Sequence, residues 1–272
     1  MSRSLLSSMV LSVAFVLGAA AQAPPALTIL RAGPTGEVSE LDQANDAGVK
    51  MRGQAAARAI GILVGLQCTV NPLAGNPVWQ EIAALSVAEQ ARAMGEPSFK
   101  ERFLAAADKP LGGADRMFEL GDPPDYEPDP STSIAARADR EGRSPLDLAF
   151  DLFAQDEGRT FLYVPIINWF DGTLDGVGQM LAHPHTVPGL SDGGAHVGTI
   201  CDASFPTTFL AYWGRDRDHG RMDLAYLVRQ HTKDTAETVG LLEDDRAAHR
   251  AGAGVAPRRR RPGRASVGSP PT

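Results

Sequence analysis

Six consecutive residues, Ser191-Asp192-Gly193-Gly194-Ala195-His196, combine a carboxylate, two glycines and an imidazole directly after the apolar run 186–190. A strand that ends in an acid and two glycines brings a carboxylate to a sheet edge where backbone can approach a ligand closely. In a (β/α)8 barrel, catalysis takes place at the C-terminal ends of the strands. Asp192 is therefore the first candidate for catalysis. It could bind a metal ion and take a proton from metal-bound water, whose pKa falls from ~15.7 toward ~7. The alternative is a loop aspartate that caps the following helix.

Other residues are candidates for substrate binding. His196 lies four residues past Asp192 in the same segment, where it could contact the carboxylate or a substrate, and Ser191 and Gly193 flank that aspartate. Arg58 follows a predicted strand and could bind a substrate carboxylate through two parallel hydrogen bonds. For His196 the alternative is an exposed or supporting histidine, and for Arg58 it is a surface arginine.

His183 and His185 have the spacing of a His-x-His metal-ligand pair but precede the last predicted strand. About six residues at ~3.3 Å each separate them by ~20 Å from Asp192, too far for a shared metal ion. We expect a loop without a metal here.

The two cysteines, Cys68 and Cys201, are too few for a disulfide framework or a four-thiolate zinc site. We expect both to be buried thiols.

The elements that would position these residues alternate between strands and helices. Residues 26–30 and 49–56 are predicted as strands, separated by a helix at 38–47. This order is typical of a parallel sheet or barrel. The nearly continuous apolar run 160–168 is predicted as a strand covered on both faces. The pattern is completed by a strand at 187–191 and helices at 79–94, 99–107, 145–154, 174–182, 205–213, 224–231 and 235–241.

Residues 122–130 interrupt this pattern with four prolines, which remove hydrogen-bond donors and fix φ. The segment is either an ordered excursion over a barrel mouth or a linker.

The charge is distributed unevenly along the 272 residues. Seven of the 26 basic residues lie in 246–272, which hold no acid, so the first 245 residues carry a net charge of −14. We therefore expect no nucleic-acid partner. Residues 243–272, rich in Arg, Gly, Pro and Ala, are predicted to be a disordered basic tail.

Residues 1–23 resemble a secretory leader, with Arg3, an apolar stretch at 9–21 and small residues before position 24. The stretch is shorter than the ~20 residues of a membrane span, and the alternative is a buried helix. We expect no membrane partner and a cytoplasmic protein, or an exported one if the leader is genuine.

Four segments carry a resemblance to a known family. Residues 189–206 resemble the last-strand signature of the N-acyl-D-amino-acid deacylase-like (D-aminoacylase) branch of the amidohydrolases. Residues 54–66, 117–128 and 229–237 also resemble this family, although a proline usually stands where this chain has Ala59. Roughly residues 27–242 are similar to the second half of the family's barrel.

The resemblance implies an α/β fold, a partial (β/α)8 TIM barrel over residues 24–242 that lacks its first half. It also implies a zinc ion, Asp192 as metal ligand and general base, and a segment around His196 that faces a small N-acyl amino acid or related amide. The chain departs from the family in its ligands: the family has a His-x-His pair on its first strand and further histidines on middle strands, whereas residues 1–182 contain no histidine.

Two functions follow. One is a truncated metal-dependent hydrolase of linear, non-peptide carbon–nitrogen (amide) bonds, active if another chain supplies the missing parts. The other is a catalytically inactive remnant or binding module that retains the rim without a metal.

Overall fold

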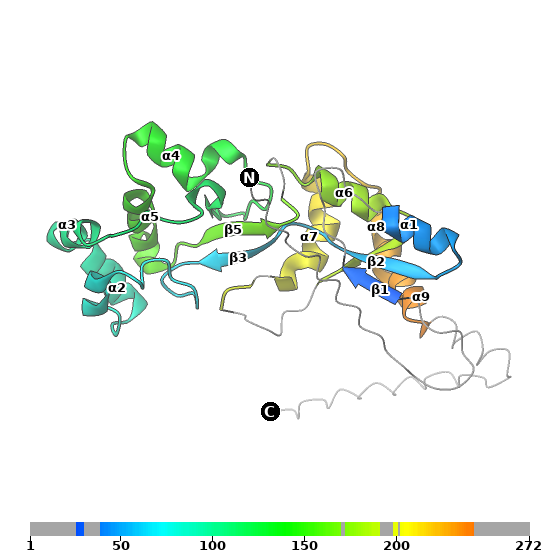
Figure 1. The fold of residues 1–272 in the computed structure, drawn as a ribbon, viewed down its shortest axis with the longest axis horizontal. Coiled ribbons are helices and arrows are strands. Elements are labelled where there is room, and N and C mark those ends of the chain that lie inside the picture. Colours follow the sequence, from blue (N-terminus) through cyan, green and yellow to red (C-terminus); the bar gives the residue numbers. More distant parts are fainter. Residues whose placement is uncertain (1–25, 30–38, 170–171, 191–197, 201, 242–272) are drawn as a thin grey trace, which may run out of the picture.

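The strands in the described part of the chain form two separate sheets. The structure is a computed structural model that describes residues 26–29, 39–169, 172–190, 198–200 and 202–241. Figure 1 shows an elongated molecule with one sheet near its middle, the other toward one end, and helices packed around both. The α/β class predicted from the sequence is confirmed. Over the described ranges the strands do not close into a barrel.

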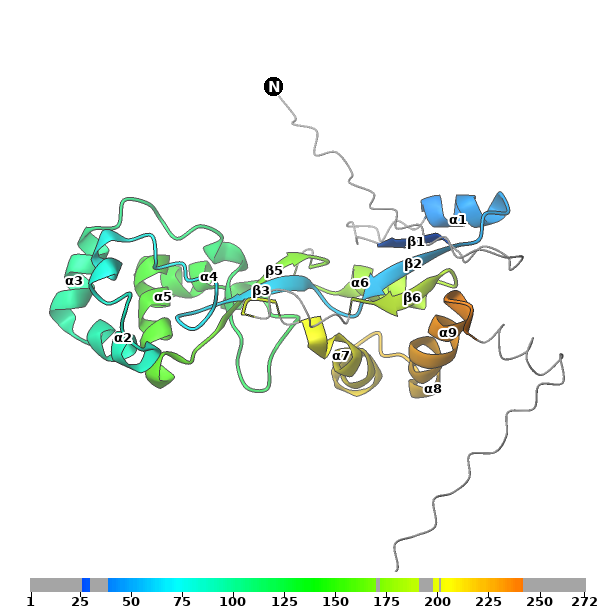
Figure 2. The same ribbon diagram turned by 90° about the horizontal axis from the view of Figure 1, so that it is seen from below.

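The first sheet is parallel and has the order β1-β2-β6. It consists of β1 (Ala26–Ile29), β2 (Met51–Ala56) and β6 (Thr186–Gly189), and α1 (Ser39–Asp46) follows β1. All four elements were predicted, and the β1–α1–β2 order gives the expected parallel pairing. Helix α1 packs on β2, and Figure 2 shows α1 and α8 (Leu224–Arg229) on opposite sides of this sheet.

The second sheet is antiparallel and has the order β3-β5-β4. Its strands are β3 (Ile60–Val64), β4 (Phe118–Glu119) and β5 (Leu162–Ile167). The prediction for 160–168 was correct about the strand, which is covered on both faces at Leu162 and Tyr163 but exposed at Ile166. This strand lies between two antiparallel neighbours and does not continue the parallel sheet.

A glycine and a proline determine how β3 and β5 pair. Gly61 lies opposite Pro165, beside a shift in register, and a Cβ on Gly61 would be 2.5 Å from the Val164 oxygen. Proline donates no ladder hydrogen bond, so within a strand it favours such irregular positions. Segment 54–66, one of the four segments that resemble the family, is divided between the two sheets.

The helices gather around the two sheets. Helix α2 begins at a capping box, in which Ser86 and Glu89 satisfy each other's backbone N–H groups. This start divides the predicted helix 79–94, whose first part is a 3-10 turn at Pro77–Glu81. The α-helices are α2 (Val87–Met94), α3 (Pro97–Ala105), α4 (Ile134–Glu141), α5 (Pro145–Ala154), α6 (Asp175–Ala182), α7 (Phe205–Ala211), α8 (Leu224–Arg229) and α9 (Thr235–Thr238), with π-helical turns η6 (Tyr212–Asp216) and η7 (Gln230–Asp234).

Two apolar clusters form the core. One fills the space among α2–α5, where the rings of Phe99, Phe103 and Phe150 lie 4.9–6.4 Å apart. The other surrounds the first sheet and takes Phe118 and Tyr163 from the second. This second cluster therefore joins the two sheets.

Gly178 in α6 tests the packing of the second cluster. Alanine is ordinarily about 1 kcal/mol better than glycine inside a helix. Here a Cβ would lie 2.9 Å from the fully buried Trp213 ring. We predict that Gly178→Ala lowers the free energy of unfolding by about 1–3 kcal/mol, the usual cost of overpacking, as measured by urea denaturation.

Gly112→Ala is the matched control, because its Cβ would meet no atom within 4 Å. Equal stabilisation by both substitutions would contradict the packing of α6 on Trp213.

Candidate functional site

Strands β2 and β6 end at the same edge of the first sheet. Their parallel register pairs Ala56 with Gly189, so Arg58, two residues past β2, and Leu190, directly past β6, leave the sheet at that edge. The other predicted site residues continue from Leu190. They are Ser191, Asp192, Gly193 and His196, and they lie outside the described residues.

Two strands end in an unusual backbone conformation. Asn168 after β5 has φ +65°, and Leu190 after β6 has φ +60°. A bulky residue rarely adopts positive φ, and such strain persists only where the surrounding structure imposes it. The turn out of β6 is thus a constrained feature directly before the predicted catalytic segment.

Arg58 lies inside the protein. Its side chain is 0% exposed, and its guanidinium carbon lies 3.9 Å from the centre of the Tyr126 ring and 4.4 Å from that of Phe205. Its Nη2 donates a hydrogen bond to Ser204 Oγ at 2.8 Å. The interpretation as a surface arginine is wrong: Arg58 is a cation stacked between two aromatic rings.

Tyr126 extends this stack to the second sheet. Its ring meets Tyr163 edge to face, with centroids 5.4 Å apart, and the Tyr163 hydroxyl donates to the Ala59 oxygen at 3.2 Å. The stack therefore connects the end of β2, the proline-rich segment, β5 and the start of α7.

Glu127 anchors the proline-rich segment 122–130. Its carboxylate, on a side chain that is 9% exposed, accepts two hydrogen bonds from Arg217 at 2.8 and 2.9 Å, and another from the Tyr212 hydroxyl. It also accepts the Leu174 N–H at 2.6 Å, which places a negative charge at the N-terminus of α6. The segment is thus an ordered excursion and not a linker.

The charges around Glu127 compensate one another. Burial raises the pKa of Glu127, but the hydrogen bonds from Arg217, Leu174 and Tyr212 outweigh it and bring the pKa below its ordinary value. Burial and the bond to Glu127 raise the pKa of Tyr212. Arg217 also pairs with Asp175 at 2.6 Å, and this bond lowers the pKa of Asp175.

His183 and His185 lie directly before β6, at the opposite end of the strand from Leu190. Their Nε2 atoms lie 3.1 and 4.0 Å from Asp42 Oδ1 in α1. Across the described ranges, no group of three or more His, Cys, Asp or Glu side chains is placed to hold a metal ion. Asp192, the predicted metal ligand, lies outside the described residues.

Cys68 is a half-buried free thiol, and burial raises its pKa. Cys201 lies outside the described residues.

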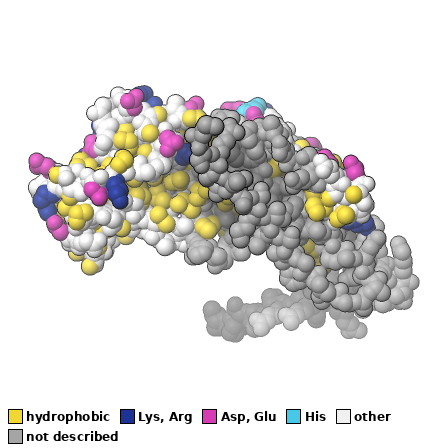
Figure 3. All heavy atoms as spheres, viewed as in Figure 1, with side chains coloured by type: hydrophobic (Ala, Val, Ile, Leu, Met, Phe, Trp, Pro, Cys, Tyr) yellow, Lys and Arg dark blue, Asp and Glu magenta, His cyan; other side chains and the backbone are white. Residues whose placement is uncertain are grey.

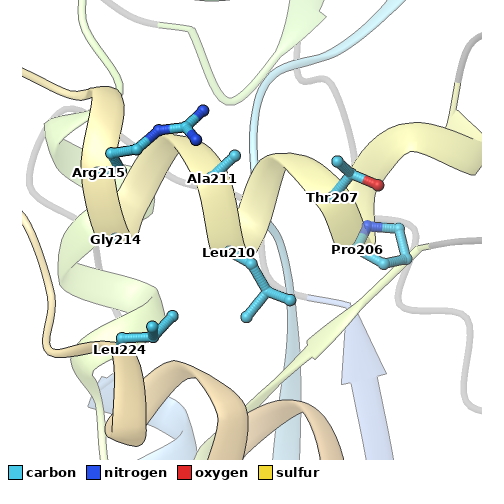
Figure 4. A pocket seen from close by; sticks show the side chains of 7 residues that line it. All are labelled: Pro206, Thr207, Leu210, Ala211, Gly214, Arg215 and Leu224. Carbon is cyan, nitrogen blue, oxygen red and sulfur yellow. The ribbon is translucent and has the colours of Figure 1, made fainter.

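The surface has two hollows near α7. A groove of about 420 Å³ separates α7 from α8, and Figure 4 shows Leu210 and Leu224 extending into it. A much smaller cavity, of about 20 Å³, is enclosed by Ala57, Gly189 and His231 among other residues. It holds no more than a single water molecule. Arg58, the predicted site residue that the structure describes, lines neither hollow.

Figure 3 shows acidic and basic side chains interspersed over the visible face near α2–α5. In the part of the chain that the structure describes, no helix is both long and apolar enough to cross a membrane.

Sequence reasoning missed Tyr126 and Glu127. The available signal was an aromatic and an acidic residue side by side in a segment otherwise dominated by proline and aspartate.

No protein-family model, curated protein or solved structure matches this chain.

The contribution of Glu127 to the stability of the protein should depend on pH. Because its folded-state pKa is lowered, ionised Glu127 stabilises the protein above its ordinary pKa of 4.5, and this stabilisation is lost as pH falls through the folded value. We predict that Glu127→Gln lowers the free energy of unfolding at pH 7 by about 3–5 kcal/mol, since the buried Arg217 then keeps only the exposed Asp175 as an ionised partner. The free energy of unfolding of this variant should also depend less on pH below pH 4.5 than that of the unsubstituted protein. Denaturation at a series of pH values measures both.

The exposed pair Glu119–Arg137 provides the control. Glu119→Gln is expected to cost about 0–1 kcal/mol. Equal losses from the two substitutions would contradict the anchoring role of Glu127.

Proposed function

We propose that this chain forms the late part of an amidohydrolase-type barrel and contributes to hydrolysis of linear amides such as N-acyl-D-amino acids. The observation that carries the proposal is the shared C-terminal edge of β2 and β6. Parallel strands that end together gather functional residues at one edge, and the segment with the amidohydrolase signature starts from this edge at Leu190.

Within this proposal, Asp192 is the catalytic carboxylate, and Ser191, Gly193 and His196 contact the substrate. Arg58, predicted as a ligand of the substrate carboxylate, lies at the same edge. Because its guanidinium is stacked between two rings, its contribution is to the shape and positive charge of this edge.

Zinc enters the proposal only through the resemblance, with Asp192 as its ligand in this chain. When bound, zinc would supply an activated water. Because residues 1–182 contain no histidine, the family's first-strand and middle-strand ligands would come from a complementing chain.

The second candidate function is a binding module that keeps the rim and holds no metal. The absence of histidine before His183 favours it, because the family's first-strand and middle-strand ligands have no counterparts in this part of the sequence. Under either function we propose a small acylated ligand, no nucleic-acid or membrane partner, and a cytoplasmic location, with export as the alternative if residues 1–23 are a leader.

Asp192→Asn tests the hydrolase. We predict that the full chain, in the assembly it forms with Zn²⁺ added, releases amine from N-acetyl-D-amino acids. Asp192→Asn should reduce this rate by at least about 100-fold, as expected when a general base is lost. An unchanged melting temperature would show that the variant is folded.

The two functions separate in one further measurement. Binding of the same amides by calorimetry, with no amine released by either protein, would contradict the hydrolase and favour the binding module.

A further inference from the structure

Tyr126 differs from the other tyrosines of the chain in how its hydroxyl is used. The hydroxyls of Tyr163 and Tyr226 donate to backbone oxygens, and that of Tyr212 donates to Glu127. Tyr126 is half-buried, and its hydroxyl has no hydrogen-bond partner within the part of the chain that the structure describes. A phenol that is held in place and left unpaired is available to a ligand.

The ring of Tyr126 is held from several directions. Arg58 stacks on its face at 3.9 Å, and Tyr163 meets it at an interplanar angle of 85°. The next residue, Glu127, is held by Arg217 and the N-terminus of α6. Because these contacts fix ring and backbone, a ligand that meets the hydroxyl incurs little cost for ordering this side chain.

The charge around the ring indicates which ligand suits it. Arg58 brings a buried positive charge to the ring face, and a phenol hydroxyl donates most strongly to an anion. A carboxylate combines an acceptor for this hydroxyl with a negative charge that the guanidinium attracts.

We propose that the Tyr126 hydroxyl binds the carboxylate of the ligand at the C-terminal edge of β2, and that Arg58 is the positioning residue that holds Tyr126. The proposal rests on the proposed function for the identity of the ligand, an N-acyl amino acid. In the sequence analysis Arg58 itself was the candidate for binding the substrate carboxylate. In this proposal the hydrogen bond to the carboxylate comes from Tyr126.

The test is NMR of the full chain with ¹³C-labelled tyrosine rings, in which Tyr126→Phe assigns one of only four tyrosines. The protein is titrated with acetate and with N-acetyl-D-alanine. The expected result is a saturable shift of the Tyr126 signal with both. Tyr126→Phe should weaken acetate binding about tenfold, in line with loss of a hydrogen bond to a charged group.

Tyr226→Phe is the matched control. Its hydroxyl donates to Leu181 in the α6 region at 2.8 Å, and its removal should leave acetate affinity unchanged. Arg58→Lys keeps the charge and removes the planar stack, so it should shift the Tyr126 signal in the free protein and weaken acetate binding as Tyr126→Phe does. If Arg58→Lys does not fold, the acetate affinities of Tyr126→Phe and Tyr226→Phe still show whether the Tyr126 hydroxyl binds the carboxylate.

The outcomes distinguish this inference from the proposed function. A Tyr126 shift with acetate but none with N-acetyl-D-alanine supports the carboxylate site and contradicts the proposed ligand. Binding of N-acetyl-D-alanine without a Tyr126 shift overturns the inference and leaves the proposed function standing. No Tyr126 shift with either compound overturns the inference.

Discussion

The geometry of the candidate site depends on how the buried carboxylate of Glu127 is paired. A buried charge is tolerated only when it is paired and hydrogen-bonded, and Glu127 receives hydrogen bonds from Arg217, Tyr212 and the start of α6. These partners come from distant parts of the chain. The proline-rich segment is therefore held against the helices that follow β5 and β6. Tyr126, the residue before Glu127, is thereby held against Arg58.

From this anchor the geometry extends to the edge of the parallel sheet. Arg58 leaves β2 and Leu190 leaves β6 at the same edge, and the aromatic stack around Arg58 joins that edge to the second sheet. The turn at Leu190 adds a backbone constraint directly before the segment with Asp192. One edge of one sheet thus brings together a buried cation, an available phenol and the start of the predicted catalytic segment.

Local patterns predicted most elements of the first sheet. The alternation of strand and helix around β1, α1 and β2 and the apolar run of β6 are local patterns, each visible within a few consecutive residues. The second sheet was not predicted, because the pairing of β3 with β5 joins residues about one hundred positions apart. The anchor at Glu127 was missed for the same reason: Arg217 lies 90 residues away, and a proline-rich segment has no periodicity that would indicate its burial.

The proposed function requires that the segment containing Asp192 lies at the same edge as Tyr126. The most direct measurement attaches a nitroxide at position 196 through His196→Cys, in a background with Cys68 and Cys201 replaced by serine, and follows the four tyrosine ring signals. Strong broadening of Tyr126, with Tyr226 much less affected, is the predicted result. A Tyr126 signal that stays sharp would contradict this proposal, because the predicted catalytic segment and the aromatic stack would then lie apart.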